Sequence, residues 1–150
     1  MTITRIDTKL NPNIVLVALN FSIDVEFEKD FQNFHGEGKG CCDYLIRLIL
    51  KDTPFWGAYM TDIIKHTPKK KSEKAMEIWK NKPALRSSCI ETFEQELKDI
   101  GAVDPYIVSF GTDVYKILKK HLPSNYTIAE PYLYHYSAWH IKKEKHLERI

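Results

Sequence analysis

The chain has few cysteines and no long apolar segment, and each absence excludes a class of protein. Its three cysteines are Cys41, Cys42 and Cys89. An odd number with two adjacent excludes a disulfide framework, the spacing does not fit a zinc site, and an iron–sulfur cluster would need a fourth thiolate. We therefore expect no metal and no other cofactor. The longest apolar runs, such as Ile14–Leu19, are too short to cross a bilayer, so no membrane partner is expected.

Basic and acidic residues are nearly balanced, with 22 Lys and Arg against 20 Asp and Glu. The formal net charge is +2, so any binding to nucleic acid has to come from a local concentration of basic residues. Residues 1–7 lack the charged-then-apolar layout of a secretory signal, and this predicts a cytoplasmic protein. A chain of 150 residues with 43% hydrophobic and 28% charged residues is typical of one globular domain, which we expect to cover residues 1–150.

Short apolar runs alternate with amphipathic stretches, a pattern that predicts strands alternating with helices. Buried strands are expected at Ile14–Leu19, Ala58–Thr61, Ile107–Phe110 and Tyr126–Tyr134, and helices at Cys42–Lys51, Ser72–Trp79, Pro83–Ile100, Thr112–His121 and Trp139–Ile150. Gly101 is expected at a helix C-cap, Gly111 in a turn, and Thr112 or Asp113 at a helix N-cap. The fold class predicted is α/β with a mainly parallel sheet.

Ligands of such sheets bind outside the carboxyl ends of the strands. The residues that follow or end the expected strands are Asn20, Thr61–Asp62, Gly111 and His135. These positions are therefore where chemistry is expected.

A basic run, Lys65, His66, Lys69, Lys70 and Lys71, leaves the end of the second expected strand. It has two interpretations. It is either a solvated loop, or a rim that follows the phosphates of a nucleic acid and adds salt-sensitive affinity without sequence preference.

His135 follows the last expected strand and is surrounded by tyrosines in Tyr132–Tyr136. A histidine among aromatic residues is commonly structural. At the ligand-binding edge, however, a neutral imidazole can donate a hydrogen bond to an oxygen on which charge develops. The tyrosines either stack on nucleobases or are present because tyrosine favours strands.

Four segments together resemble the uracil-DNA glycosylase superfamily. Ala18-Leu-Asn-Phe-Ser22 is similar to the G-I-N-P-G motif of the mismatch-type enzymes, and Tyr59–Lys65 to the I-T-N-x-V-K segment of the thermostable iron–sulfur enzymes. Asp104–Gly111 resembles their P-x-x-I-x-x-L-G segment, and His135-Tyr-Ser-Ala138 their H-P-S-P motif. The order matches over residues 13–138. The resemblance implies a three-layer α/β/α sandwich with a four-stranded parallel sheet.

The resemblance also implies roles for individual residues. Asn20 takes the place of the residue that positions the attacking water, and His135 that of the histidine that stabilises the departing base. Asp62 stands where the family has an asparagine that contacts the uracil edge. The substrate-binding set is completed by Phe21 and Ser22, which stand where the family has Pro-Gly, and by Ser137.

Asp62 changes the expected specificity. An asparagine can accept from uracil N3–H and donate to O4, whereas an ionised aspartate can only accept. A base with two adjacent donors, such as the N1–H and N2–H₂ edge of a guanine-like lesion, should therefore fit better than uracil. The alternative is that Asp62 bonds to nearby backbone or pairs with Lys65.

The leading hypothesis is a uracil-DNA-glycosylase-like protein that excises a modified base from DNA, with DNA or a nucleobase-containing ligand as its partner. The first alternative is a non-catalytic nucleic-acid or nucleotide-binding module on the same fold. The second is a hydrolase that acts on a free nucleoside or another small molecule and needs no basic rim.

Overall fold

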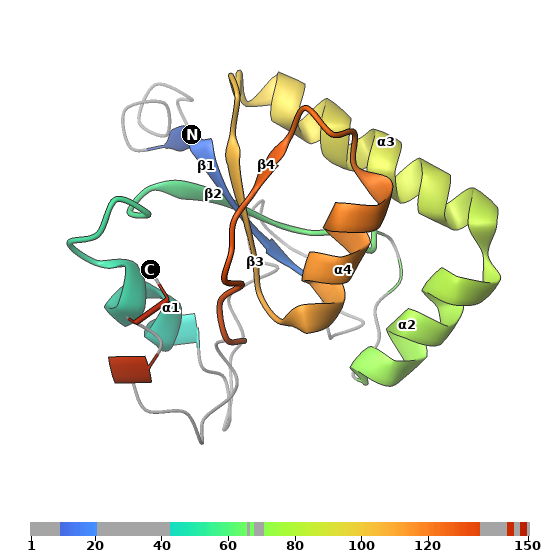
Figure 1. Ribbon diagram of the computed structural model, residues 1–150, viewed down its shortest axis with the longest axis horizontal. Helices are drawn as coiled ribbons and strands as arrows, with labels where there is room; N and C mark the ends of the chain where they lie inside the picture. Colours follow the sequence, from blue (N-terminus) through green and yellow to red (C-terminus); the bar gives the residue numbers. More distant parts are fainter. Residues whose placement is uncertain are drawn as a thin grey trace, which may run out of the picture.

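A computed structural model describes residues 10–20, 43–65, 67, 71–135, 144–145 and 148–149. Helices and strands alternate along these residues, except that two helices follow each other between the second and third strands (Figure 1). In chain order they are β1 (Asn11–Ala18), α1 (Asp43–Leu50), β2 (Ala58–Asp62), α2 (Ser72–Asn81), α3 (Pro83–Asp99), β3 (Tyr106–Ser109), α4 (Thr112–His121) and β4 (Thr127–Ile128).

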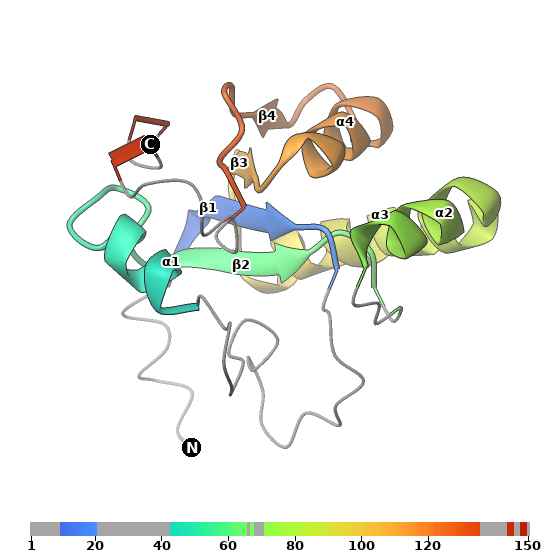
Figure 2. The same cartoon turned by 90° about the horizontal axis from the view of Figure 1, so that it is seen from below.

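The strands form a four-stranded sheet in the order β2-β1-β3-β4, and every pair in it is parallel. β1 lies inside the sheet, where Val15 pairs with Tyr59 of β2 on one side and with Ile107 of β3 on the other. Figure 2 shows β1 and β2 side by side, running in the same direction. The α/β fold with a parallel sheet, expected from the alternation of patterns, is confirmed.

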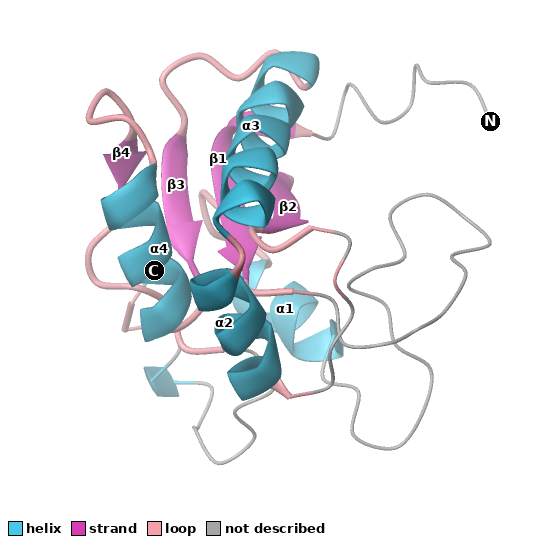
Figure 3. Cartoon of the chain, turned by 90° about the vertical axis from the view of Figure 1, so that its right-hand side faces the viewer, coloured by secondary structure: helices cyan, strands magenta, loops and turns pink. Residues whose placement is uncertain are grey.

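Helices cover both faces of the sheet, with α2, α3 and α4 in front of the strands in Figure 3 and α1 behind them. Successive side chains of a strand point to opposite faces, so β1 contributes to two apolar clusters. Val15 and Val17 pack with buried side chains of α2, α3 and α4. Leu16 and Ala18 pack with buried side chains of α1. The result is three layers of helix, sheet and helix.

β1 begins three residues earlier than the apolar pattern indicates. The added residues include Asn11 and Asn13, and both form hydrogen bonds with neighbouring segments. The Asn11 amide donates to the Gly57 carbonyl at 2.6 Å, and Asn13 Oδ1 accepts from the Val103 amide at 3.0 Å. The register is irregular between Asn11 and Val15.

The fourth strand is much shorter than the expected Tyr126–Tyr134, with regular pairing only at Thr127–Ile128 and an isolated bridge between Phe110 and Leu133. The Ala129 amide donates to Ile107, and the Leu133 amide donates to Ser109. Ala129 and Leu133 are four residues apart, but their acceptors on β3, Ile107 and Ser109, are only two residues apart. The extra residues, which include Pro131 without an amide proton, cannot continue the ladder.

Glycines fix two helix ends. After α3, Gly101 has φ +70°, its amide donates to Lys98, and the next amide, of Ala102, donates to Leu97, which is a Schellman motif. Before α4, Gly111 occupies the N-cap with φ +83°. The prediction of Thr112 or Asp113 as the N-cap was wrong, because the helix already begins at Thr112 and no side chain caps it.

Two other expected features need separate mention. α2 extends two residues beyond the expected end at Trp79, to Asn81. The helix expected over residues 139–150 lies largely outside the described residues.

Candidate functional site

Four residues on neighbouring strands form a row across the carboxyl edge of the sheet, in the order Asp62, Ala18, Phe110 and Leu133. Asp62 of β2 pairs with Ala18 of β1, the Phe110 amide donates to the neighbouring Val17 carbonyl at 2.8 Å, and Phe110 bridges to Leu133. Asn20 lies two residues beyond Ala18, and His135 lies two residues beyond Leu133. Asn20, Asp62 and His135 therefore lie at the same edge of the sheet. The backbones at the two ends of the row are three strand spacings apart, about 14 Å.

Asn20 is oriented by the loop that follows β2. Its Nδ2 atom donates to the Thr67 carbonyl at 3.4 Å. Just before it, the amides of Ile63 and Ile64 donate to the carbonyls of Ala18 and Leu19, both at 2.9 Å. The segments that leave β1 and β2 thus remain paired beyond the ends of the two strands, and this pairing brings Asn20 and Asp62 to one part of the edge.

Asp62 is buried, with 4% of its surface exposed. Strand alternation places it on the same face as Ala58 and Met60, which pack against the cluster formed with α1. A carboxylate with so little exposure needs polar partners, because burial of an unpaired charge is costly. The predicted alternative partner, Lys65, instead forms its ion pair with Glu96, described below.

His135 is half-buried beside Phe110, whose own side chain is 6% exposed. Burial lowers the pKa of His135 below its ordinary value of 6.5. At neutral pH the imidazole is therefore uncharged, and a neutral imidazole has one N–H to donate. This is the protonation state that the expected role requires.

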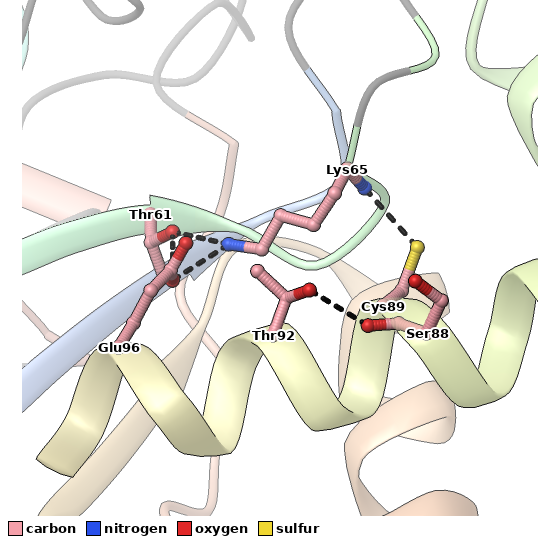
Figure 4. Close-up of polar contacts among 6 residues, drawn as sticks. All are labelled: Thr61, Lys65, Ser88, Cys89, Thr92 and Glu96. Carbon is pink, nitrogen blue, oxygen red and sulfur yellow. Dashed lines mark hydrogen bonds and ion pairs between the residues drawn. The ribbon is translucent and has the colours of Figure 1, made fainter.

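Lys65 does not belong to a solvent-facing basic rim, so this part of the prediction was wrong. Its side chain is 10% exposed, and Nζ lies 2.7 Å from Glu96 Oε2 of α3 and 2.6 Å from Thr61 Oγ1 (Figure 4). This pair could not be predicted from the sequence, because Glu96 lies on a different element, 31 residues away.

The same pair of elements holds two further polar groups. Burial, followed by the negative charge of Glu96, raises the pKa of Tyr59 to about 12. Burial also raises the pKa of the Cys89 thiol, whose sulfur accepts from the Lys65 amide at 3.3 Å. Both groups are therefore protonated at neutral pH, and we assign them no chemical role.

Near the chain's end, a basic residue contacts two of the tyrosines that precede His135. The Arg149 guanidinium lies 3.7 Å from the centre of the Tyr134 ring, and its Nη1 atom donates to the Tyr132 carbonyl at 2.9 Å. Stacking of these tyrosines on bases was one of two sequence interpretations. In the structure Tyr134 carries a guanidinium on its ring.

Several predicted site residues lie outside the described residues: Phe21, Ser22, His66, Lys69, Lys70 and Ser137. Lys71 is exposed at the N-cap of α2. Within the described part of the chain, no group of three or more His, Cys, Asp or Glu side chains could hold a metal ion. Nor does any helix in those ranges have the length and apolar character needed to cross a membrane.

Comparisons with protein-family models, with curated proteins and with solved structures found no match to this chain.

Proposed function

We propose that this chain is a uracil-DNA-glycosylase-like protein that binds a nucleobase at the carboxyl edge of its sheet and hydrolyses the bond between that base and its sugar. The observation that carries the proposal is the position of Asn20, Asp62 and His135 at one edge of a parallel sheet. This is the edge at which α/β proteins bind ligands. The four motif resemblances in the sequence supply the chemical roles.

In this reaction the bond between the sugar C1′ and the base nitrogen breaks, and its electron pair leaves with the base. The oxygen of a water molecule then bonds to C1′, and the water's proton is released to solvent or to the departing base. Asn20 would hold that water through its amide oxygen. Its Nδ2 atom is directed to the Thr67 carbonyl, and this contact would fix the orientation of the amide.

His135 would act on the departing base. Charge develops on an oxygen of the base as the bond breaks, and a neutral imidazole N–H aimed at that oxygen stabilises it. The lowered pKa of His135 supports this role, because the imidazole stays neutral at the pH where the reaction would proceed.

Asp62 would contact the hydrogen-bonding edge of the base. A carboxylate accepts two hydrogen bonds and donates none. We therefore propose a base with two adjacent donors, such as guanine or a guanine lesion, in preference to uracil. A base held between Asp62 and His135 is contacted from both ends of the row that crosses the sheet.

The test is incubation of the purified protein with oligonucleotides that each carry one modified base, followed by alkali cleavage at abasic sites. The expected result is cleavage of an 8-oxoguanine or related oligonucleotide at a higher rate than a uracil oligonucleotide. Asn20→Ala and His135→Gln should each lower the rate by about 100-fold or more. Asn81→Ala and His121→Gln, which change the same residue types on α2 and α4, are matched controls.

Release of no base from any oligonucleotide would contradict the catalytic proposal. Base-dependent affinity without turnover would instead favour the non-catalytic module on the same fold.

A further inference from the structure

A buried lysine ties the end of β2 to α3 through a closed set of contacts. Lys65 Nζ lies 2.6 Å from Thr61 Oγ1 and 2.7 Å from Glu96 Oε2, and Thr61 Oγ1 lies 2.8 Å from the same carboxylate oxygen. The donors and acceptors are consistent: the ammonium donates to both oxygens, and the threonine hydroxyl accepts from Lys65 and donates to Glu96. Figure 4 shows the three side chains meeting between the strand and the helix.

α3 holds the backbone of Lys65 as well as its side chain. The Lys65 amide donates to Cys89 Sγ at 3.3 Å, and its Nζ atom lies 6.0 Å from the centre of the Phe93 ring. Cys89, Phe93 and Glu96 are spaced i, i+4 and i+7, so they form one face of the helix. Lys65 is therefore fixed at two points along a single helix face.

The segment held in this way connects two residues of the candidate site. Thr61 and Lys65 bracket Asp62, since one directly precedes it and the other follows it by three residues. Two residues after Lys65, the Thr67 carbonyl accepts from Asn20 Nδ2. A movement of Lys65 relative to α3 would therefore displace both Asp62 and the acceptor that orients Asn20.

We propose that Lys65 is a positioning residue, which acts with Glu96 and Thr61 to set the orientation of Asp62 and Asn20 and does not contact nucleic acid. The base preference then depends on this buried ion pair. The proposal rests on the proposed function for its effect on base recognition. Its effect on Asp62 and Asn20 can be measured in the free protein.

The test uses Lys65→Met, which keeps an unbranched side chain but removes the ammonium, and Lys65→Arg, which restores a cation with several donors. Lys74→Met, at an exposed position of α2, is the matched control. Glu96 has a side-chain exposure of 26%, so it can be hydrated in Lys65→Met and the variant should fold. Circular dichroism and thermal unfolding of each variant check this.

The first measurement is NMR of the free protein. Lys65→Met is expected to shift the Asn20 side-chain amide signal and to speed amide exchange at Ile63 and Ile64 by about tenfold, equivalent to about 1.4 kcal/mol. Lys65→Arg should return both toward wild type, and Lys74→Met should change neither. Wild-type signals and exchange rates in Lys65→Met would overturn the proposal, whether or not the protein binds DNA.

The second measurement compares two oligonucleotides that differ at one position, where one carries 8-oxoguanine and the other cytosine. The quantity is the affinity for the first divided by the affinity for the second. Lys65→Met should lower this ratio about fivefold, with partial recovery in Lys65→Arg, and leave the salt dependence unchanged. A drop in the slope of log affinity against log salt by about 0.7–0.9 would instead make Lys65 a phosphate contact and refute the positioning role. If the wild-type protein binds every oligonucleotide with the same affinity, the proposed function fails. The NMR measurement alone then decides the role of Lys65.

Discussion

The imidazole of His135 meets the ring of Phe110 edge to face, with ring centroids 6.4 Å apart and planes inclined at 67°. Phe110 follows β3, and His135 follows the segment that bridges to Phe110 through Leu133. The contact therefore joins two parts of the carboxyl edge and contributes to the partly apolar surroundings of the histidine. Burial in these surroundings lowers the pKa of His135 below its ordinary value.

The stability of the protein should fall as the pH falls below about 6.5, in part because of His135. Its folded-state pKa lies below the unfolded value, so in the interval between the two the unfolded chain binds more protons than the folded chain. Stability contributed by the neutral imidazole is present above the unfolded pKa and is lost as the pH falls to the folded pKa. His135→Gln should therefore make urea unfolding less pH-dependent between about pH 7 and pH 5.

His121 is the comparison for this measurement. Its pKa is lowered by burial and then by the charges of Lys120 and Arg86. Added salt should weaken the charge-dependent part of the His121 effect and leave the effect of His135, which arises from burial, largely unchanged. An identical pH dependence in wild type and His135→Gln would show that His135 titrates normally in the folded protein.

Asp62→Asn should increase activity or affinity toward uracil. The amide supplies the donor that uracil O4 needs, and the aspartate leaves this oxygen facing another acceptor. The gain expected is roughly 5- to 200-fold, which corresponds to about 1–3 kcal/mol for an unsatisfied buried polar group. The measurement is uracil excision, or uracil-DNA affinity if there is no turnover, with Asp99→Asn on α3 as control. The same values for Asp62→Asn and wild type on every base tested would remove Asp62 from the base-contacting set.

Replacing Lys69, Lys70 and Lys71 with Ala should weaken DNA binding on every sequence, if this run follows phosphates. The plot of log affinity against log salt should flatten by about two to three units, at about 0.7–0.9 per phosphate contact. Lys65 is left out of this variant because its ammonium is paired with Glu96. The control is one variant that carries both Lys51→Ala and Lys98→Ala. Both lysines are exposed, and they lie near the C-terminal ends of α1 and α3. An unchanged slope would make the run a solvated loop.

Arg149→Ala should loosen the segment that leads to His135. The guanidinium lies on the Tyr134 ring and donates to the Tyr132 carbonyl, and loss of both contacts should cost about 1 kcal/mol. Hydrogen exchange should become faster at residues 132–135 and stay unchanged in β1. Lys145→Ala, at an exposed position nearby in the sequence, is the control, and equal exchange in both variants would show that Arg149 does not hold this segment.

The order and type of the described helices and strands follow from local patterns in the sequence. Runs such as Val15–Leu19 are continuously apolar because a strand inside a covered parallel sheet is buried on both faces, and this local property is visible in a single sequence. Gly101 and Gly111 were predicted for a similar reason, since their positive φ angles are conformations that glycine adopts without strain. Parallel pairing then brought Asn20, Asp62 and His135 to one edge.

Other features were decided by the tertiary structure, because they depend on residues far apart in the chain. The four lysines of the basic run looked alike in sequence, yet Lys65 became a buried ion-pair partner when α3 placed Glu96 beside it. The short β4 depends on how its segment matches β3, and the position of Arg149 on Tyr134 joins residues 15 apart. Periodicity reports which face of an element is buried, but the partner that a charged side chain meets there is set by the packing of whole elements.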